Sequence, residues 1–368
     1  MRVFCTNCGS QADFDPAQFR CECGGAWETV ERADFDPALI DREDRSLWRY
    51  RQLLGLDFEQ PAVRLGEGWT PLVALPFRGR EVLCKLEYFG PTASFKDRGS
   101  AVMINTLIYQ GVTHIAEDSS GNAGASIAAY AARAGIRAEI YVPAHASPAK
   151  QAQIAIYGAE VRPIDGPRVN AKLAALAARE RGVTIAAHAY HPAFLLGQQT
   201  VGWELWEQTP RLPDWYIVPV GQGLHLLGAW LAFRRLRAAG LIERLPRLVA
   251  VQAARLAPVV RAWEAGLDAV PAVELPPIPS LAEGLAIAEP VRGRRILQAL
   301  RESGGLALAV EEEAITAAQH DLARCGLFVE PTCATAAAAL DAIYAQAAPD
   351  EVIAVGLTGS GLKGVPQT

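Results

Sequence analysis

The stretch WYIVPVGQGLHLLGAWLAFRRL, residues 215–236, decides the fold class. It begins with a short continuous apolar run, which is typical of a strand that is buried on both faces of a sheet. A glycine loop follows, and the next residues form an apolar segment long enough for a helix. A buried strand, a glycine loop and a helix in this order are the unit from which parallel sheets covered by helices are built.

Other segments repeat this order. HIAEDSSGNAGASIAAYAARAG, residues 114–135, predicts a strand, a loop of small residues and a helix, and FKDRGSAVMINTLIYQG, residues 95–111, predicts a helix with one apolar face. Further strands are predicted in the segments 81–87, 137–143, 248–253 and 351–363. We therefore predict an α/β fold with two open, twisted parallel-sheet domains. In such folds the functional residues lie at the carboxyl ends of the strands.

The chain has 368 residues, enough for roughly two domains with sizeable cores. We expect the smaller, mobile α/β domain at 110–200. The larger, cofactor-binding domain is expected to combine 66–109 with 201–368. A cysteine-bearing segment at 1–30 and a charged connector at 31–65 precede both domains.

Composition narrows the class of partner. The formal net charge is −5, and no long block of lysine and arginine occurs, which argues against nucleic acid and anionic membranes. No apolar run reaches the roughly 18 residues that a membrane-spanning helix needs. The first residues lack the basic and then apolar pattern of a secretory signal. We therefore expect a cytoplasmic protein that acts on a small molecule.

Four of the seven cysteines lie close together near the start of the chain: Cys5, Cys8, Cys21 and Cys23. This spacing can offer four thiolates to one tetrahedral ion, so we predict a zinc ribbon. Four thiolates leave no open coordination position, and the metal would be structural. The alternative is a set of scattered cysteines in an unstructured tail. The odd total of cysteines fits a reducing compartment.

A lysine stands at the start of a predicted helix, in the stretch PTASFKDRG, residues 91–99. The positive end of the helix dipole disfavours a cation there. Burial and that dipole would lower the pKa of Lys96 and make it an amine nucleophile toward an aldehyde. The alternative is an ordinary exposed lysine. The neighbouring Thr92, Ala93, Ser94 and Phe95 are small or apolar, which favours the first interpretation.

Three further loops follow predicted strands. VGQGLH, residues 220–225, could bind one phosphate at a helix start, or it could be an ordinary turn. In SSGNAG, residues 119–124, Ser119, Ser120 and free N–H groups could bind a carboxylate. Asn122 could donate to a ring oxygen or merely cap the helix. In TGSG, residues 358–361, Thr358 could offer its hydroxyl to a ring nitrogen or be a plain turn residue.

A phosphate loop, a ring-oxygen amide, a ring-nitrogen hydroxyl and a Schiff-base lysine together describe a site for pyridoxal 5′-phosphate. The order GEGWTPL, PTASFKDRG, SSGNAGASIAAYAARAG, PVGQGLHLLG and LTGSGLK resembles threonine synthase, within the fold-type II pyridoxal phosphate enzymes. ESGG and GLFVEPTCATAAAAL also resemble that family, and the likeness covers about residues 60 to 363. It implies the tryptophan synthase beta-like fold, a homodimer and an amino-acid substrate.

The resemblance also implies residue roles. Lys96 would form the Schiff base with the cofactor and act as the catalytic base, Asn122 would hydrogen-bond the ring oxygen, and Thr358 would face the pyridine nitrogen. The phosphate cup would consist of Gly221, Gln222, Gly223, Leu224 and His225. The expected substrate contacts are Ser94, Ser119, Ser120, Gly121 and His191.

Two features depart from the family pattern. Gln222, Leu224 and His225 stand in the cup where asparagine and small residues are common, and AHAYHPAFLLGQQT, residues 187–200, carries His188 and His191 where asparagine holds the substrate phosphate. Either histidine could instead be a packed or capping residue. Lys150, in the segment SPAKQAQ, could contact an anion or simply be a solvated charge.

Three functions therefore remain. The first is a carbon–oxygen lyase that converts O-phospho-L-homoserine and water to L-threonine and phosphate. The second is another enzyme of this type that performs β-elimination or β-replacement, such as a serine/threonine ammonia-lyase or a cysteate-synthase-like enzyme. The third is a binding protein that uses the cysteine ribbon, and the acidic balance and the intact Lys96 argue against it.

Overall fold

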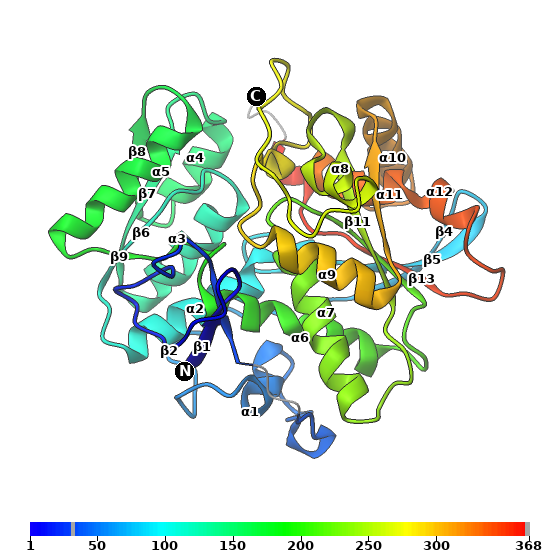
Figure 1. Cartoon of the computed structure of the whole chain (residues 1–368), viewed down its shortest axis with the longest axis horizontal. Helices are drawn as coiled ribbons and strands as arrows, with labels where there is room; N and C mark the ends of the chain where they lie inside the picture. The colour runs from blue at the N-terminus through cyan, green and yellow to red at the C-terminus, as the bar shows by residue number, and fades with distance from the viewer. Residues whose placement is uncertain (31–33, 365–368) are drawn as a thin grey trace.

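The structure is a computed structural model that describes residues 1–30 and 34–364. The first three residues of the predicted connector 31–65 and the last four of the predicted large domain lie outside this description. Two lobes lie side by side, each built around its own sheet, with the N-terminal segment in front of the junction between them (Figure 1).

The larger sheet has six strands in the order β12-β11-β10-β13-β5-β4. Five strands run parallel, as predicted, and the edge strand β4 pairs antiparallel with β5. A short turn after β4 leads directly into β5, and such a short connection can only join antiparallel neighbours. The strands are β4 Leu72–Phe77, β5 Arg80–Lys85, β10 Trp215–Pro219, β11 Arg247–Ala253, β12 Leu306–Val310 and β13 Ile353–Gly356.

Successive residues of the central strands enter two different cores. Tyr216 and Val218 of β10 belong to a cluster with α6, α7 and α9, while Trp215 and Ile217 belong to a cluster with α10, α11 and α12. Helices therefore cover both faces of the sheet, and this explains why the strand sequence is apolar without alternation.

The smaller sheet has four parallel strands in the order β8-β7-β6-β9. Its strands lie within the predicted small domain and are β6 His114–Glu117, β7 Arg137–Pro143, β8 Glu160–Ile164 and β9 Thr184–Ile185. The fold class is thus confirmed, with parallel sheets in two lobes. The domain boundaries themselves stay a prediction.

The helices expected in the segments 95–111, 114–135 and 215–236 are α2, α3 and α7. The helices of the described residues are α1 Arg51–Leu54, α2 Lys96–Tyr109, α3 Asn122–Ala134, α4 Pro148–Ala155, α5 Arg168–Ala177, α6 Pro192–Gln208, α7 Leu224–Ala238, α8 Pro258–Glu264, α9 Gly293–Ser303, α10 Glu312–Arg324, α11 Pro331–Ala338 and α12 Leu340–Tyr344. Short 3₁₀ turns are η1 Pro37–Leu39, η2 Leu47–Tyr50, η3 Glu87–Phe89, η4 Ala178–Arg181, η5 Ala254–Leu256, η6 Glu283–Leu285 and η7 Gly361–Gly364.

Helix α2 differs from its expected amphipathic form. Every residue from Asp97 to Leu107 is buried, because α2 lies between α3 and α6 rather than on the surface. The connector is also more buried than its charged sequence suggests, since Leu47, Trp48 and Tyr50 are inaccessible to solvent. Among the described residues, no helix combines the length and the hydropathy that a membrane span requires.

The N-terminal segment forms a three-stranded antiparallel sheet in the order β2-β1-β3. Its strands are β1 Arg2–Cys5, β2 Gln11–Asp13 and β3 Trp27–Thr29. The small sheet carries only a few apolar side chains of its own, so it relies on the cysteines and on the two lobes for its stability.

Candidate active site

Lys96 is the first residue of α2, and its side chain is half-buried. Its Nζ lies 4.1 Å from the centre of the Phe95 ring and has no hydrogen bond or ion pair within the described part of the chain. Burial lowers the pKa of Lys96 to about 8, while the carboxylates of Glu330 and Glu117 act in the opposite direction. A substantial fraction of the amine is therefore neutral near physiological pH, as a nucleophile or base requires.

The loop before Lys96 is joined to the TGSG loop that follows β13. Phe95 N donates to the Thr358 carbonyl at 3.0 Å, and Ser94 forms a bridge with Gly359. The side-chain hydroxyls of Ser94 and Thr358 are both buried and have no hydrogen-bond partner among the described residues. Unpaired buried hydroxyls are costly, so their presence beside Lys96 points to a ligand that would bind them.

Asn122 begins α3, but it does not cap the helix. The N-cap is Gly121, and no side chain bonds to the first turn. Instead, Asn122 Nδ2 donates to Glu330 Oε1 at 2.9 Å, and Asn122 Oδ1 accepts from Lys363 Nζ at 2.8 Å. The interpretation of Asn122 as a cap is therefore wrong. Its amide lies in a polar group with a carboxylate that also acts on Lys96.

The glycine loop before α7 is shaped by two positions. Gly223 has φ +74, a left-handed conformation that favours glycine. A Cβ on Gly221 would lie 3.0 Å from the Gly284 carbonyl oxygen. Gln222 does not point freely into the cleft, because its Oε1 accepts from Val291 N at 3.1 Å. The loop presents backbone N–H groups at a helix start, where one phosphate can bind.

The side chain of His225 lies in the core rather than in the phosphate cup. Its Nε2 is 2.7 Å from the Tyr216 hydroxyl, and its ring packs edge-on against Phe95, with 5.0 Å between the ring centres. Burial lowers its pKa to about 4, so the ring is neutral at physiological pH. Any contact of His225 and of the buried Leu224 with a phosphate is thus limited to the backbone.

The loop before α3 is more open than the glycine loop before α7. Ser119 is buried, its Oγ accepts from Gly121 N at 3.4 Å, and Ser120 and Gly121 are half-buried. A Cβ added to Gly121 would meet nothing within 4 Å, whereas one on Gly124 would lie 1.9 Å from the Ser119 carbonyl oxygen. The loop is therefore packed tightly against α3 at Gly124, whereas the space around Gly121 is open.

His191 was predicted to contact the substrate, and the structure places it elsewhere. It is buried, its Nδ1 accepts from Ala193 N at 3.2 Å as the cap of α6, and its ring packs on Phe14 with 4.7 Å between ring centres. Burial lowers its pKa to about 3. The alternative of a packed, capping histidine is the one that fits, and we assign His191 no substrate contact.

Several polar residues of this site were not singled out from the sequence. Glu330 and Lys363 both contact Asn122. Glu330 lies in the motif GLFVEPTCATAAAAL and Lys363 in LTGSGLK, and both motifs supported the resemblance to the family. Asp97 follows Lys96 directly and accepts from Thr92 N at 2.8 Å and from Ser126 Oγ at 2.6 Å, which ties α2 to α3. Lys150, considered as an anion contact, pairs with Glu283 at 2.5 Å across the two lobes.

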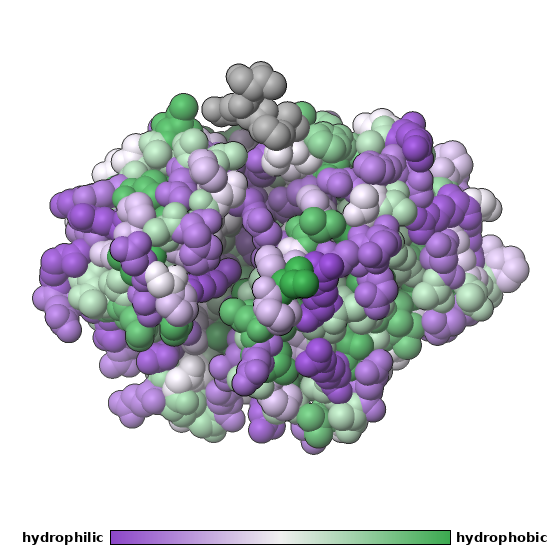
Figure 2. All heavy atoms as spheres, turned by 90° about the horizontal axis from the view of Figure 1, so that it is seen from above, coloured by the Kyte–Doolittle hydropathy of each residue, from purple (hydrophilic) through white to green (hydrophobic). Residues whose placement is uncertain are grey.

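A cavity of about 240 Å³ lies between the lobes and reaches the candidate site at Asp118, before the loop 119–121, and at Gln222 of the glycine loop. One wall comes from the lobe of the smaller sheet and includes Asp118 and His188, and the other includes Gln222 and Glu289. Figure 2 looks onto the molecule from above and shows hydrophilic side chains along the hollow between the two halves. Most of the lining side chains are apolar, and a few charged ones stand among them.

These residues fit pyridoxal phosphate. The glycine loop suits a single phosphate, Asn122 offers an amide, and the hydroxyl of Thr358 is buried without a partner among the described residues. Lys96 offers an amine whose pKa burial has lowered. The four elements are far apart in the sequence: Asn122 follows β6 of the smaller sheet, and Glu330 links it to the TGSG loop at the end of the larger sheet.

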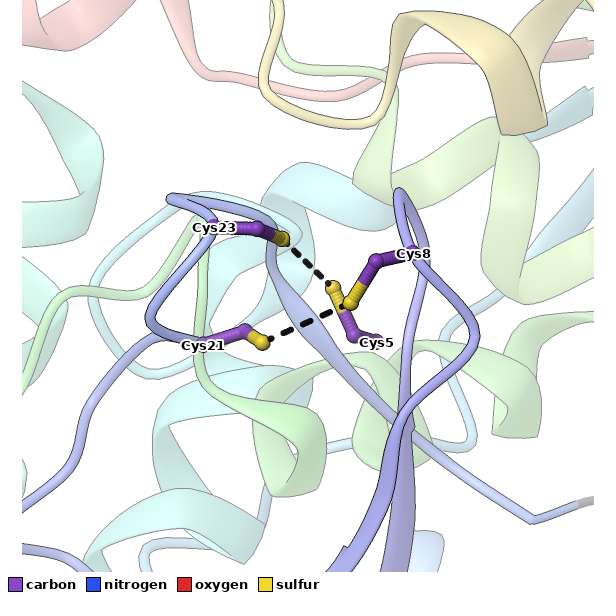
Figure 3. A group of neighbouring side chains, drawn as sticks. All are labelled: Cys5, Cys8, Cys21 and Cys23. Carbon is purple, nitrogen blue, oxygen red and sulfur yellow. Dashed lines mark hydrogen bonds between the residues drawn. The ribbon is translucent and has the colours of Figure 1, made fainter.

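The four N-terminal cysteines also converge. Their sulfur atoms all lie within 4.8 Å of one another, with Cys5 and Cys23 at 3.4 Å and Cys8 and Cys21 at 3.7 Å (Figure 3). Four thiolates around one zinc ion at about 2.3 Å lie roughly 3.8 Å apart, so the donor set fits a structural zinc ion. The alternative of scattered cysteines in an unstructured tail is wrong.

Comparison with known proteins shows the family of the chain. The model of the family "Pyridoxal-phosphate dependent enzyme" matches residues 63–359. The chain is 33% identical to the threonine synthase of Methanosarcina acetivorans, over 99% of this chain and 92% of that protein. It is 32% identical to the threonine synthase of Methanocaldococcus jannaschii, over 98% and 92%.

Solved structures extend the likeness to three dimensions. A threonine deaminase from T.th. superimposes with a TM-score of 0.68 and 28% identity, covering 79% of this chain and 92% of that one. Maize serine racemase gives a TM-score of 0.67 and 25% identity, covering 79% and 88%. The chain therefore belongs to the fold-type II pyridoxal-phosphate dependent enzymes and is a homologue of threonine synthases.

Proposed function

We propose that this chain converts O-phospho-L-homoserine and water to L-threonine and inorganic phosphate. The observation that carries the proposal is Lys96, an amine at a helix start with a pKa of about 8 and no ion pair among the described residues. The similarity to two archaeal threonine synthases, which includes the cysteine segment, supports the choice of substrate.

Each candidate residue receives a role in this proposal. Lys96 would hold the aldehyde carbon of pyridoxal phosphate, Asn122 its ring oxygen and Thr358 its ring nitrogen, and the glycine loop 221–225 would bind its phosphate. Bound there, the cofactor would withdraw electrons from the carbon atoms next to the substrate amino group. A neutral hydroxyl such as that of Thr358 does not protonate the ring nitrogen, which favours elimination over transamination.

Lys96 would then act on the substrate as a base. Its Nζ would take a proton from Cα and then one from Cβ, and the Cγ–O bond would break with loss of phosphate. Protons would return to Cγ and to Cα, and water would supply the hydroxyl at Cβ. Ser119, Ser120 and Gly121 lead into α3, where the helix dipole and free N–H groups attract a carboxylate, and the unpaired hydroxyl of Ser94 lies in the loop before α2. We assign these residues to binding the substrate carboxylate.

The test is a direct assay of both products. Purified protein loaded with pyridoxal phosphate is incubated with O-phospho-L-homoserine, and phosphate and threonine are measured over time. The proposal predicts equal amounts of the two products and their loss in Lys96→Arg, which keeps the positive charge. Phosphate without threonine, or no turnover, would contradict the proposed reaction.

A second reaction has specific support from the structure. His188 binds the Glu117 carboxylate through its N and Nδ1, at 3.1 and 2.9 Å, and the Nδ1 of the buried His191 caps α6, so only the Nε2 atom of each ring has no hydrogen-bond partner among the described residues. The pKa of the adjacent Asp118 is raised by burial and by Glu117. These acidic neighbours favour a substrate without phosphate, and the same assay with serine and threonine, followed by 2-oxo acid and ammonia, tests β-elimination. Added thiol nucleophiles test β-replacement.

A further inference from the structure

The cysteine ribbon, residues 1–30, makes contact with both lobes. On the side of the smaller sheet, Phe19 belongs to a buried cluster with β9 and α5, its ring meets that of Tyr190 with 5.5 Å between centres, and Arg179 donates to the Ala17 carbonyl at 3.0 Å. On the other side, Glu28 is buried and pairs with Arg292 and Arg295, which flank the start of α9. The ribbon therefore spans the junction that Figure 1 shows behind it.

Arg292 is the point at which these contacts meet. Its side chain has no exposed surface, and it donates to the Trp27 carbonyl at 2.6 Å and to Glu28 Oε2 at 3.3 Å. The same guanidinium donates to the carbonyls of Ala189 and Tyr190, each at 3.2 Å. A guanidinium has five N–H donors in a rigid fork, so one side chain can hold three segments in a fixed arrangement.

The carbonyls that Arg292 holds belong to a connection between the lobes. Residues 186–191, here called the crossing segment, run from β9 of the smaller sheet to the start of α6, which packs with α2 and α7. Its central residue, His188, holds the Glu117 carboxylate through its N and Nδ1. Glu117 ends β6 and is followed at once by the substrate loop, residues 118–121.

A continuous path of hydrogen bonds thus leads from the ribbon to the substrate loop. It passes from Glu28 and Trp27 to Arg292, from Arg292 to the crossing segment, and from His188 to Glu117. Within the described part of the chain, the side chain of Arg292 bonds to the ribbon and the crossing segment and not to the glycine loop 220–225. The backbone next to Arg292 does meet that loop, because Val291 N donates to Gln222 Oε1 at 3.1 Å.

We propose that Arg292 is a positioning residue, which ties the cysteine ribbon to the crossing segment and thereby holds the substrate loop in the geometry that binds the amino-acid substrate. Arg292 touches neither the cofactor site nor the reacting atoms. Its loss is expected to weaken substrate binding while the chemical step on bound substrate continues. The inference rests on the proposed function only in requiring an amino-acid substrate at this site, and it does not depend on the identity of the substrate side chain.

The chain offers a matched control for this proposal. Arg295 pairs with the same Glu28 and lies three residues further along, packing on Trp230, and none of its bonds among the described residues reaches the crossing segment. Arg295→Met therefore removes a cation from the same interface without releasing the carbonyls of Ala189 and Tyr190. Arg292→Met removes a cation from this interface and also releases the two carbonyls. Arg292→Lys keeps the charge but lacks the forked guanidinium that reaches several acceptors.

The experiment uses enzyme loaded with pyridoxal phosphate and compares KM with kcat for the substrate that the product assay identifies. We expect Arg292→Met to raise KM about tenfold with kcat within about twofold, Arg292→Lys to fall between it and the original protein, and Arg295→Met to leave KM nearly unchanged. Zinc content is measured in each variant, because equal content shows that the ribbon remains formed.

A second readout needs no substrate and so separates this proposal from the proposed function. Backbone hydrogen exchange in Arg292→Met, or in Arg292→Lys if the first variant does not fold, should speed up in residues 117–121 and 186–191 and stay unchanged in the strands β4 and β5, residues 72–85. An unchanged rate in 117–121, a uniform rise over the whole chain, an equal loss in kcat and in kcat/KM, or a rise in KM for Arg295→Met as large as that for Arg292→Met would each overturn the proposal.

Discussion

Lys85 and Lys96 lie 11 positions apart in the sequence, and burial lowers the pKa of both, but their surroundings are opposite in kind. Lys85 Nζ donates to Glu204 and to the Thr70 carbonyl, each at 2.7 Å, and to Gln208 at 2.9 Å. Lys96 has none of these partners within the described residues. Burial alone thus does not identify a reactive lysine, and the supply of acceptors decides between a structural and a chemical role.

Lys85 belongs to a buried ion cluster, defined here as Lys85, Glu87, Arg98 and Glu204. Arg98 donates to Glu87 at 2.6 and 2.7 Å and to Glu204 at 2.5 and 2.7 Å, so two cations face two anions. A balanced buried cluster keeps its charges, because each is paired and hydrogen-bonded. It anchors the first turn of α2 to η3 and α6, and thus fixes the helix from which Lys96 projects.

The largest effect is expected for Lys96→Ala. Removing the amine takes away the proposed base and the group that would hold the cofactor, so turnover should fall by about 10³-fold or more. Product release and the visible absorption of bound pyridoxal phosphate are the two measurements. Retention of that absorption at full strength would show that the cofactor is not attached to Lys96. It would also contradict the assignment of a chemical role to Lys96 and a structural role to Lys85.

A smaller effect, on stability rather than chemistry, is expected for Lys85→Met. It leaves one anion of the buried ion cluster without a cation, which should cost about 3 kcal/mol in the free energy of unfolding. Denaturant unfolding measures this loss, and kcat should change only a few-fold. The double variant Lys85→Met/Glu204→Gln restores the balance of charge and should recover part of the stability. A loss of turnover like that of Lys96→Ala would contradict the structural role.

The pH dependence of cofactor uptake sharpens the comparison further. Only a neutral amine attacks an aldehyde, so uptake of pyridoxal phosphate by cofactor-free protein should rise about tenfold for each pH unit and level off above pH 8, because the pKa of Lys96 is about 8. Glu330 raises this pKa. Glu330→Gln should therefore move the midpoint to lower pH, and a shift to higher pH would be inconsistent with this electrostatic account.

The smallest effect concerns the loop before Lys96. Ala93 has φ +61, a left-handed conformation that disfavours residues with a Cβ. Ala93→Gly relieves this strain but increases the freedom of the unfolded chain, so we expect a net stabilisation below about 1 kcal/mol. Unfolding of the cofactor-free protein measures it. A destabilised variant would show that the Ala93 methyl group contributes more by packing than the backbone strain costs.

Much of the architecture followed from the sequence because its signals are local. The strand of residues 215–219 is apolar without alternation, and the glycine at 223 needs a left-handed turn, so both could be predicted from neighbouring residues. The antiparallel edge β4 was not predicted, although Pro76 inside it is a signal of an edge strand, because a proline cannot donate to a neighbouring strand. The burial of α2 on all sides depends on partners from other parts of the chain.

The candidate site shows the same division. Its residue types stood in short motifs, and the cysteine spacing indicated a metal ribbon, so the sequence by itself determined the kind of chemistry and the family. Only the tertiary structure decided which groups are free to act. In the structure His225 and His191 are buried and neutral. Glu330 and Lys363 contact Asn122. The ribbon contacts both lobes, and Arg292 bonds to it. The physical reason is that the sequence gives the type of each side chain directly, whereas its partners and its burial, and hence its charge, depend on residues that are distant in the sequence.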